Sequence, residues 1–404
     1  MIAMIPDIAQ QRLAFFVMLL SLACLRAAAQ PVQNAPTPGT GSNSPGSPTG
    51  NTGGQAESPS LSSQREARTR ARNSYVRLAR APHMFGDTLR PSATLSFRQE
   101  GAQGGQTPTV ELPLGGGGSY NIADNNSALP KDRVYFLYNG FFNAVDSSVP
   151  GLGTRSADLH MYRFGFEKTF LDGLWSMDLR MPITSNYDLR TPGITTDSGT
   201  IGNFSMFLKR LIFKSDDMAI ASGLGIGLPT GNDVVVTTFT NRLTIQNEAV
   251  HLMPYVALMA TPNDRWFVQS FAQIDFAASG NDVVTPQGTV GTYTEQNLMH
   301  LDVGLGRWLG QPMGYRYLRG IASVFELHYT STLQDSDRID FPNAGLIQTI
   351  QVAGNHTDLL NLTSGLHFQL TPASNLRVGA VAPLKAEPNR AFDSEIYVSF
   401  NRFF

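Results

Sequence analysis

The chain contains one cysteine in 404 residues, and this residue, Cys24, lies near the N-terminus. The segment around it, residues 13–25, is apolar, follows Arg12 and precedes Ala27-Ala28-Ala29. A positive residue, a short apolar run and small residues before a cleavage point are typical of a secretory signal peptide. We expect residues 1–29 to be removed, which would leave the mature chain without a thiol. This excludes a disulfide scaffold and a thiol enzyme.

Long apolar runs and an excess of charge are also missing. Beyond the N-terminal segment, no apolar run approaches the roughly 20 residues that a membrane-spanning helix needs. The 30 Lys and Arg residues nearly balance the 32 Asp and Glu residues, for a formal net charge of −2. A near-neutral chain argues against nucleic-acid binding. Any passage through a membrane must therefore use the strands of a β-barrel.

Two N-terminal segments lack the composition of a packed domain. Residues 30–63 are mostly Pro, Gly, Ser, Thr, Asn and Gln, so we predict a disordered linker. Residues 64–82 combine helix formers with many arginines, which predicts a basic helix. This helix either contacts lipid headgroups, the cell wall or the mouth of a barrel, or leads into the domain as a solvated helix.

Residues 83–132 hold short strand-like pieces around four consecutive glycines, Gly115 to Gly118. No strand–helix–strand pattern surrounds this run, and no Lys followed by Ser or Thr comes after it, so a phosphate-binding loop is excluded. We predict that this segment is an irregular plug or a periplasmic cap.

From residue 133 to residue 404 the pattern is regular. Long loops rich in Gly, Asp, Asn, Ser and Thr alternate with tight turns such as Leu171-Asp172-Gly173. This alternation and an even strand count are typical of an outer-membrane barrel with both ends on the short-turn side. We therefore predict an all-β fold, a transmembrane outer-membrane antiparallel β-barrel of about 12 strands (alternatively 14) with an N-terminal plug-like segment. The expected strands lie near residues 133–145, 158–170, 174–184, 200–214, 218–229, 248–260, 265–278, 295–309, 318–333, 357–370, 374–384 and 394–404.

The two faces of these strands differ in polarity. Met177, Leu179 and Met181, for example, alternate with Asp178 and Arg180. Charges of both signs on one face are costly in a dry core and ordinary in a wet lumen. The predicted lumen-lining residues are Asp178, Arg180, Lys209, Arg265, Gln269, Asp275, His300, Asp302, Glu326, His328 and Arg377.

Strand 218–229 has one face made only of small residues, including Gly223 and Gly225. Glycine weakens a strand, so something must pack closely against this wall or the strand must curve tightly. The small face is either a wide lumen wall, a seat for the plug, or a barrel corner.

Four of the predicted lumen residues form a potential cluster. His300 and Asp302 lie on one expected strand and Glu326 and His328 on the next, and a hairpin centred near Gly314 would bring all four together. The group would either bind a divalent metal or form a hydrogen-bonded network that braces the wall, and we favour the network. No histidine is followed by serine two residues later, as in outer-membrane phospholipases, so we expect neither an enzyme nor any catalytic, cofactor or metal residue.

The final strand, residues 395–404, alternates up to the last residue. Ile396, Val398 and Phe400 share one face, which suits lipid, and the opposite face suits a polar lumen. The resemblance to barrels that end in an aromatic residue implies that Phe400 and Phe404 form an assembly signal. The barrel-assembly machinery would recognise this signal.

Two further stretches resemble a known family. Gly199 to Leu211, followed by Ala221 to Gly231 with its Leu-Pro-Thr-Gly ending, resembles a strand pair of outer-membrane barrels associated with the meta pathway of phenol degradation. Gly202-Asn203 stands where that family usually has Gly-Asp. The resemblance implies a channel or transporter for small molecules, including hydrophobic or aromatic ones.

The sequence thus predicts a secreted protein of the cell outer membrane that acts as a channel or transporter. Its expected partners are outer-membrane lipid, the barrel-assembly machinery and a small-molecule solute, with no nucleic acid. One competing interpretation is a structural or adhesive surface protein in which the barrel is an anchor and the loops, especially residues 334–356, bind. The other is a soluble, secreted β-sandwich.

Overall fold

The computed structural model describes residues 77–87, 89, 93–99, 107–112, 121–151, 153–185, 193–197, 201–238, 242–310, 318–343, 345–352 and 355–404. The predicted signal peptide, linker and most of the predicted basic helix lie outside these residues. The chain divides into two compact units, residues 1–70 and 71–404, and the description below concerns the second. No helix among the described residues is long and apolar enough to cross a membrane.

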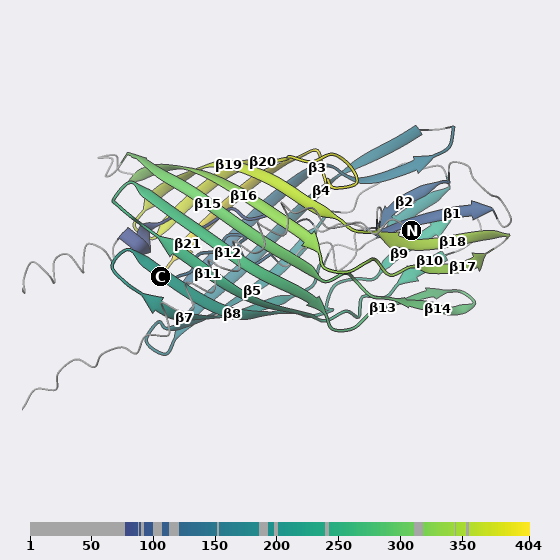
Figure 1. The fold of residues 1–404 in the computed structure, drawn as a ribbon, viewed down its shortest axis with the longest axis horizontal. Helices are drawn as coiled ribbons and strands as arrows, with labels where there is room; N and C mark the ends of the chain where they lie inside the picture. The colour runs from purple at the N-terminus through teal and green to yellow at the C-terminus, as the bar shows by residue number, and fades with distance from the viewer. Residues whose placement is uncertain are drawn as a thin grey trace, which may run out of the picture. The chain divides into compact units, whose positions relative to one another are not determined.

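Twelve antiparallel strands form a closed barrel, and each strand pairs with the next along the chain (Figure 1). The ring closes where β21 pairs with β3, from Ser394 opposite Phe142 to Phe403 opposite Arg133. The prediction of twelve strands is confirmed, and the alternatives of fourteen strands and of a soluble sandwich are wrong. The barrel strands are β3 (Arg133–Val149), β4 (Gly153–Phe170), β5 (Trp175–Thr184), β7 (Ser205–Lys214), β8 (Met218–Gly227), β11 (His251–Ala260), β12 (Trp266–Ala277), β15 (Leu298–Gly310), β16 (Gly320–Thr332), β19 (Asp358–Thr371), β20 (Ser374–Pro383) and β21 (Ser394–Phe403).

Apolar side chains cover the outside of the barrel, and polar side chains fill the inside. Phe164, Val303 and Phe325 are each more than half exposed although they stand in the middle of strands. The alternate positions are buried and often charged, as Arg133 and Glu326 show. This arrangement is the reverse of that in a soluble barrel, because here the apolar surface faces outward and needs lipid to cover it.

The long connections contain strands of their own. A five-stranded sheet follows the order β14-β13-β10-β9-β6, and two further strands, β17 and β18, form a hairpin. The sequence predicts these regions only as loops, because the pieces are short and rich in turn residues. Their bounds are β6 (Ile194–Asp197), β9 (Val234–Thr238), β10 (Arg242–Ile245), β13 (Asn281–Thr285), β14 (Gly288–Tyr293), β17 (Ile339–Asn343) and β18 (Leu346–Val352).

The N-terminal part of the unit reaches this same long-loop end. β1 (Ala93–Gln99) lies between β18 and β2 (Thr109–Leu112), and β2 pairs with Ser147 and Ser148 at the far end of β3. Buried apolar residues from these strands and the loop sheets form one core, which includes Leu95, Val110 and Ile350. The long-loop end is therefore a packed structure, which we call the β-head (Figure 1).

Between the short-turn end and the β-head, the chain passes through the barrel and returns. A helical turn at residues 77–80 lies at the short-turn end, where Arg77 contacts Asp264 at 3.5 Å. Residues 81–87 and 121–129, which we call the inner segment, lie side by side within the barrel, since Met84 N–H donates to Asn126 O at 2.8 Å. The chain then reaches β3 through Lys131 and Asp132 at the short-turn end.

Candidate functional site: the occupied lumen

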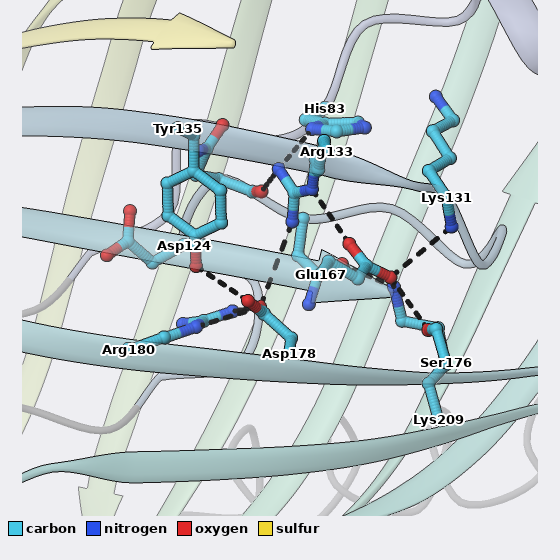
Figure 2. A network of polar contacts seen from close by, with 12 residues as sticks. His83, Asp124, Lys131, Arg133, Tyr135, Glu167, Ser176, Asp178, Arg180 and Lys209 are labelled. Carbon is cyan, nitrogen blue, oxygen red and sulfur yellow. Dashed lines mark hydrogen bonds and ion pairs between the residues drawn. The ribbon is translucent and has the colours of Figure 1, made fainter. Parts of the chain in front are cut away.

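Glu167 is the centre of a buried ionic network in the short-turn half of the lumen (Figure 2). Its carboxylate accepts hydrogen bonds from Arg133 Nε at 2.7 Å, Lys209 Nζ at 2.9 Å and Ser176 Oγ at 2.7 Å. These side chains come from β3, β4, β5 and β7, because inward positions recur at every second residue of each strand. Burying one carboxylate among two cations is tolerable only because every partner is hydrogen-bonded.

Asp178 forms a second centre next to it. Its carboxylate accepts from Tyr135 Oη at 2.9 Å and from Arg180 Nε at 3.0 Å (Figure 2). A guanidinium nitrogen of Arg133 lies 3.8 Å away, which joins the two centres into one network. Adjacent barrel strands are thus linked through their inward side chains as well as through their backbones.

The wall binds the inner segment mainly through cations that meet backbone carbonyls. Arg377 donates to His83 O at 2.5 Å and to Met84 O at 2.8 Å. Arg180 donates to Asn121 O at 3.1 Å, and Arg133 donates to Asn125 O at 2.6 Å. The inner segment has no sheet partner inside the barrel, so these donors satisfy carbonyls that would otherwise be buried without a hydrogen bond.

Glu326 provides the matching acceptor. Its carboxylate receives Phe85 N–H at 2.8 and 2.9 Å and Gly86 N–H at 3.0 Å. Two successive amides converge on one anion because Gly86 has a φ of 81°, which side-chain-bearing residues rarely adopt. Gln273 Oε1 similarly accepts Ile122 N–H at 2.7 Å.

Three members of the predicted four-residue cluster come together. His328 Nδ1 lies 2.6 Å from Asp302 Oδ1, and its Nε2 lies 3.3 Å from Glu326 Oε2. His300 does not join them and contacts Thr330 Oγ1 at 2.9 Å, because the strands pair two residues out of the predicted register, with Asp302 opposite His328. Within the described part of the chain, no group of His, Cys, Asp or Glu has the arrangement of a metal site.

The structure places ten of the eleven predicted lumen residues inside the barrel with buried side chains. Gln269 donates to Pro82 O at 2.6 Å, and Asp275 lies 2.8 Å from His251 Nδ1. The position predicted for Arg265 is wrong: this residue lies in the short turn before β12 and is exposed. Arg265 is an even number of residues from the inward residue Gln269, but it precedes Trp266, the first residue of the strand.

Several important interior residues were not predicted. Arg133 and Glu167 anchor the network, and Arg163 forms an ion pair with Asp124 of the inner segment. The period-2 alternation of Arg163, Gly165 and Glu167 with the outward aromatics Phe164 and Phe166 is the sequence signal that indicates their inward position. The side chains of the inner segment do not indicate its contacts with the wall, because its backbone makes most of them.

The small face of β8 accommodates neighbouring wall residues. A Cβ atom on Gly223 would lie 2.4 Å from Tyr255 Oη, and one on Gly225 would lie 2.4 Å from a ring carbon of Phe207. The seat for the inner segment is elsewhere: a Cβ on Gly365 of β19 would lie 2.3 Å from the ring of Phe85. Glycines thus make room for large inward side chains.

The two stretches that resemble the phenol-pathway family lie on the paired strands β7 and β8 and the residues that flank them. Asn203 Oδ1 accepts Gly231 N–H at 2.8 Å, and Thr230 Oγ1 accepts Phe204 N–H at 2.8 Å. Asn203 of the first stretch therefore binds the glycine at the end of the second stretch.

No protein-family model matches the chain. Among curated proteins, the cell division protein FtsZ of Buchnera aphidicola subsp. Baizongia pistaciae (strain Bp) is 27% identical over 191 residues, which are 40% of this chain and 48% of that protein. The chain spans about half the length of this relative, and the match assigns no family.

Solved structures with a similar fold are outer-membrane and translocator proteins. An outer membrane channel from Pseudomonas putida F1 is 12% identical, with 69% of this chain and 97% of that chain covered and a TM-score of 0.44. The translocator domain of the autotransporter NalP from Neisseria meningitidis is 11% identical, with 68% and 89% covered and a TM-score of 0.43. The toluene transporter TodX of Pseudomonas putida is 9% identical, with 68% and 90% covered and a TM-score of 0.35. The pairing of β21 with β3 closes the barrel in this chain itself.

Proposed function

We propose that this protein is an outer-membrane channel or transporter for small molecules, including hydrophobic or aromatic ones, which its inner segment holds closed. The observation that carries the proposal is a polar, charged wall inside an apolar exterior, with the wall hydrogen-bonded to a separate stretch of chain. Arg377, Gln273 and Glu326 bind backbone groups of that stretch. When the stretch moves, water can form hydrogen bonds with these three polar side chains in its place. A barrel that serves only as an anchor needs no such movable segment in its lumen.

The exterior supports the outer-membrane location. Outward side chains such as Phe166, Leu305 and Leu366 are all at least 40% exposed, and lipid is the environment in which such a surface is stable. We infer secretion through the N-terminal signal and a passive role without catalysis. The interior carries charges of both signs, which favours a path of weak ion selectivity.

A second candidate function rests on the β-head. Its apolar core is independent of the lumen network and includes Leu95, Val236 and Ile350. A packed head above a plugged barrel fits a structural or adhesive protein whose loops bind a partner outside the cell.

Planar-bilayer conductance decides between the two. The secreted chain and a variant with the weakened contacts Glu326→Gln and Arg377→Met would be compared after both are shown to have the heat-modifiable mobility of a folded barrel. We expect rare openings for the native chain and frequent openings for the variant. If both folded proteins stay silent, the channel proposal fails and the adhesive function is favoured.

A further inference from the structure

A pocket of about 870 Å³ lies at the short-turn end, between the inner segment and the ends of the barrel strands. One wall consists of the chain on either side of the inner segment, including Arg80 and Lys131, and the other consists of strand ends and turns, including Leu211 and Phe403. This volume is within the range of roughly 300–1,000 Å³ that is typical of small-molecule sites. The pocket exists while the lumen is occupied, so it does not depend on the channel being open.

The pocket has more positive than negative side chains. Arg80, Lys131 and Arg319 line it, and none of them forms an ion pair with a carboxylate of the described residues. The Arg80 guanidinium lies 5.8 Å from the ring centre of Trp308, and Lys131 Nζ lies 5.5 Å from that of Phe403. Aromatic faces attract cations but leave their charge uncompensated.

Two carboxylates, Asp132 and Asp172, also line the pocket. Asp132 is already bound by Lys168 Nζ at 2.7 Å and by the backbone and side chain of Thr169 at 2.6 Å. Asp172 lies in an exposed turn. Neither carboxylate forms an ion pair with Arg80, Lys131 or Arg319, so the balance of charge around the pocket is positive.

Two buried histidines leave polar ring atoms without a partner. His83 is 2% exposed, and its Nδ1 lies 2.8 Å from an Arg133 guanidinium nitrogen, which can only donate. Its Nε2 therefore carries the proton, and among the described residues this donor has no acceptor. His367 is 1% exposed and differs from His83: its Nε2 donates to Gln369 Oε1 at 3.2 Å, so its Nδ1, without a partner in the described part of the chain, is an acceptor and does not contribute to binding an anion. His83 also lines the pocket, so an acceptor on a ligand there would satisfy this buried donor.

We propose that this pocket binds a small organic anion whose head is held by Lys131 and His83 Nε2–H and whose apolar body packs on Leu211 and Phe403. Carboxylate and phosphate ester heads share the required chemistry, since both accept from N–H donors and balance a positive charge. The apolar lining, which also includes Leu174 and Phe404, explains why an inorganic ion alone would not fill the pocket.

The titration of Lys131 is consistent with this site. Burial lowers the pKa of Lys131 to about 7, and repulsion from Arg133 adds to the effect. A bound anion would stabilise the ammonium form and raise this pKa again.

The test is isothermal titration calorimetry on the full secreted chain in detergent, with benzoate, phenyl phosphate and the neutral benzyl alcohol as probes. We expect at least one anion to bind about tenfold or more tightly than benzyl alcohol, as a charge-assisted hydrogen bond predicts. The ratio of benzoate to phenyl phosphate affinity then tells whether the head is a carboxylate or a phosphate. Lys131→Met should weaken anion binding by about tenfold or more while leaving benzyl alcohol unchanged.

Lys385→Met is the matched control. Lys385 Nζ also lies over an aromatic ring, that of Tyr329 at 5.6 Å, but outside the pocket, so anion binding should not change. Arg319→Gln provides a second pocket variant in case Lys131→Met alters the fold, and it should also weaken anion binding. Equal affinity for benzyl alcohol and both anions, no saturable binding, or full anion binding in folded Lys131→Met and Arg319→Gln would overturn the proposal. A protein that shows no conductance in the bilayer can still bind the anion in the calorimeter. The channel proposal and the pocket proposal are therefore tested separately.

Discussion

Glu326 and Phe85 are 241 positions apart in the chain, yet both oxygens of the Glu326 carboxylate accept the Phe85 amide, at 2.8 and 2.9 Å. This contact joins the middle of β16 to the first stretch of the inner segment, residues 81–87. It is charge-assisted and buried, the conditions under which a single hydrogen bond contributes most. If the protein acts as proposed, we expect this contact to affect how often the lumen opens.

Glu326→Gln should raise the open fraction of the channel. The amide keeps the shape but removes the charge and one acceptor, so the inner segment should be held less tightly by about 1.5 kcal/mol, or roughly tenfold in open probability. Single-channel recording measures this. Glu248→Gln, an exposed glutamate in a long connection, should conduct like the native chain.

Gly86→Ala should displace the inner segment without unfolding the barrel. Its φ is 81°, and a Cβ there would lie 2.3 Å from Asp124 Cα. Gly151 also has a φ of 81° but has nothing within 4 Å, so Gly151→Ala carries the same backbone strain without the clash. Limited proteolysis should cut the inner segment faster only in Gly86→Ala. Equal cleavage of the two variants would show that the close packing around Gly86 is unimportant.

A reversible lock on the inner segment should control conduction. Asn125 and Asn401 exchange hydrogen bonds at 3.1 and 3.2 Å, and the mature chain is expected to contain no other cysteine. Asn125→Cys with Asn401→Cys, introduced into Glu326→Gln and joined through disulfides by a short bis-methanethiosulfonate cross-linker, should abolish openings. Reduction should restore them. Continued conduction in the fully cross-linked protein would mean that solutes bypass the inner segment.

Arg133→Met should destabilise the barrel strongly. Removing this cation leaves Glu167 and Asp178 buried with fewer partners, a change that costs roughly 3–5 kcal/mol in comparable buried networks. Urea unfolding in detergent, followed by gel mobility, measures the loss. Arg402→Met removes an exposed outward arginine and should shift the midpoint little.

Attachment of β2 should weaken as the pH rises. Burial raises the pKa of Glu111 to about 7, with repulsion from Asp146 and Glu387 adding to it. Because the folded state holds this proton more tightly than the unfolded state does, stability is highest at acidic pH and falls as the pH rises from about 4.5 to about 7. Hydrogen exchange of the β2 amides, corrected for intrinsic rates, should show this loss, and Glu111→Gln should remove the pH dependence.

The barrel could be predicted from the sequence because lipid on one side and a wet lumen on the other impose a strict alternation. Met177 and Asp178 of β5 illustrate it, and the alternation recurs in most of the barrel strands, with β8 as an exception. The register could not be predicted: the hairpin expected near Gly314 is displaced, so His300 lies beside Thr330 and apart from His328. Connection geometry sets the register, and hydrophobic alternation cannot distinguish positions two residues apart.

The contacts of the lumen residues were harder to predict from the sequence than the fold. The alternation along their strands predicts that Arg377 and Glu326 point into the lumen. Their partners, however, are the backbone carbonyl of His83 and the backbone amide of Phe85, and backbone groups leave no signal in the sequence. The pocket beside Lys131 draws on the chain before β3 and on the ends of distant strands, so only the closed ring brings it together.

The paired strands β1 and β2 have a consequence for assembly. Both ends of the inner segment emerge at the short-turn side, while the chain between them is bonded to β18 and β3 on the other side. Either the chain crosses the ring before these pairs form, or the ring closes around the chain; once formed, the pairs hold the chain on the β-head side. Withdrawal toward the short-turn side would require the head to be dismantled first. Opening is thus a rearrangement around a fastened strand, and the occupant of the lumen is never released.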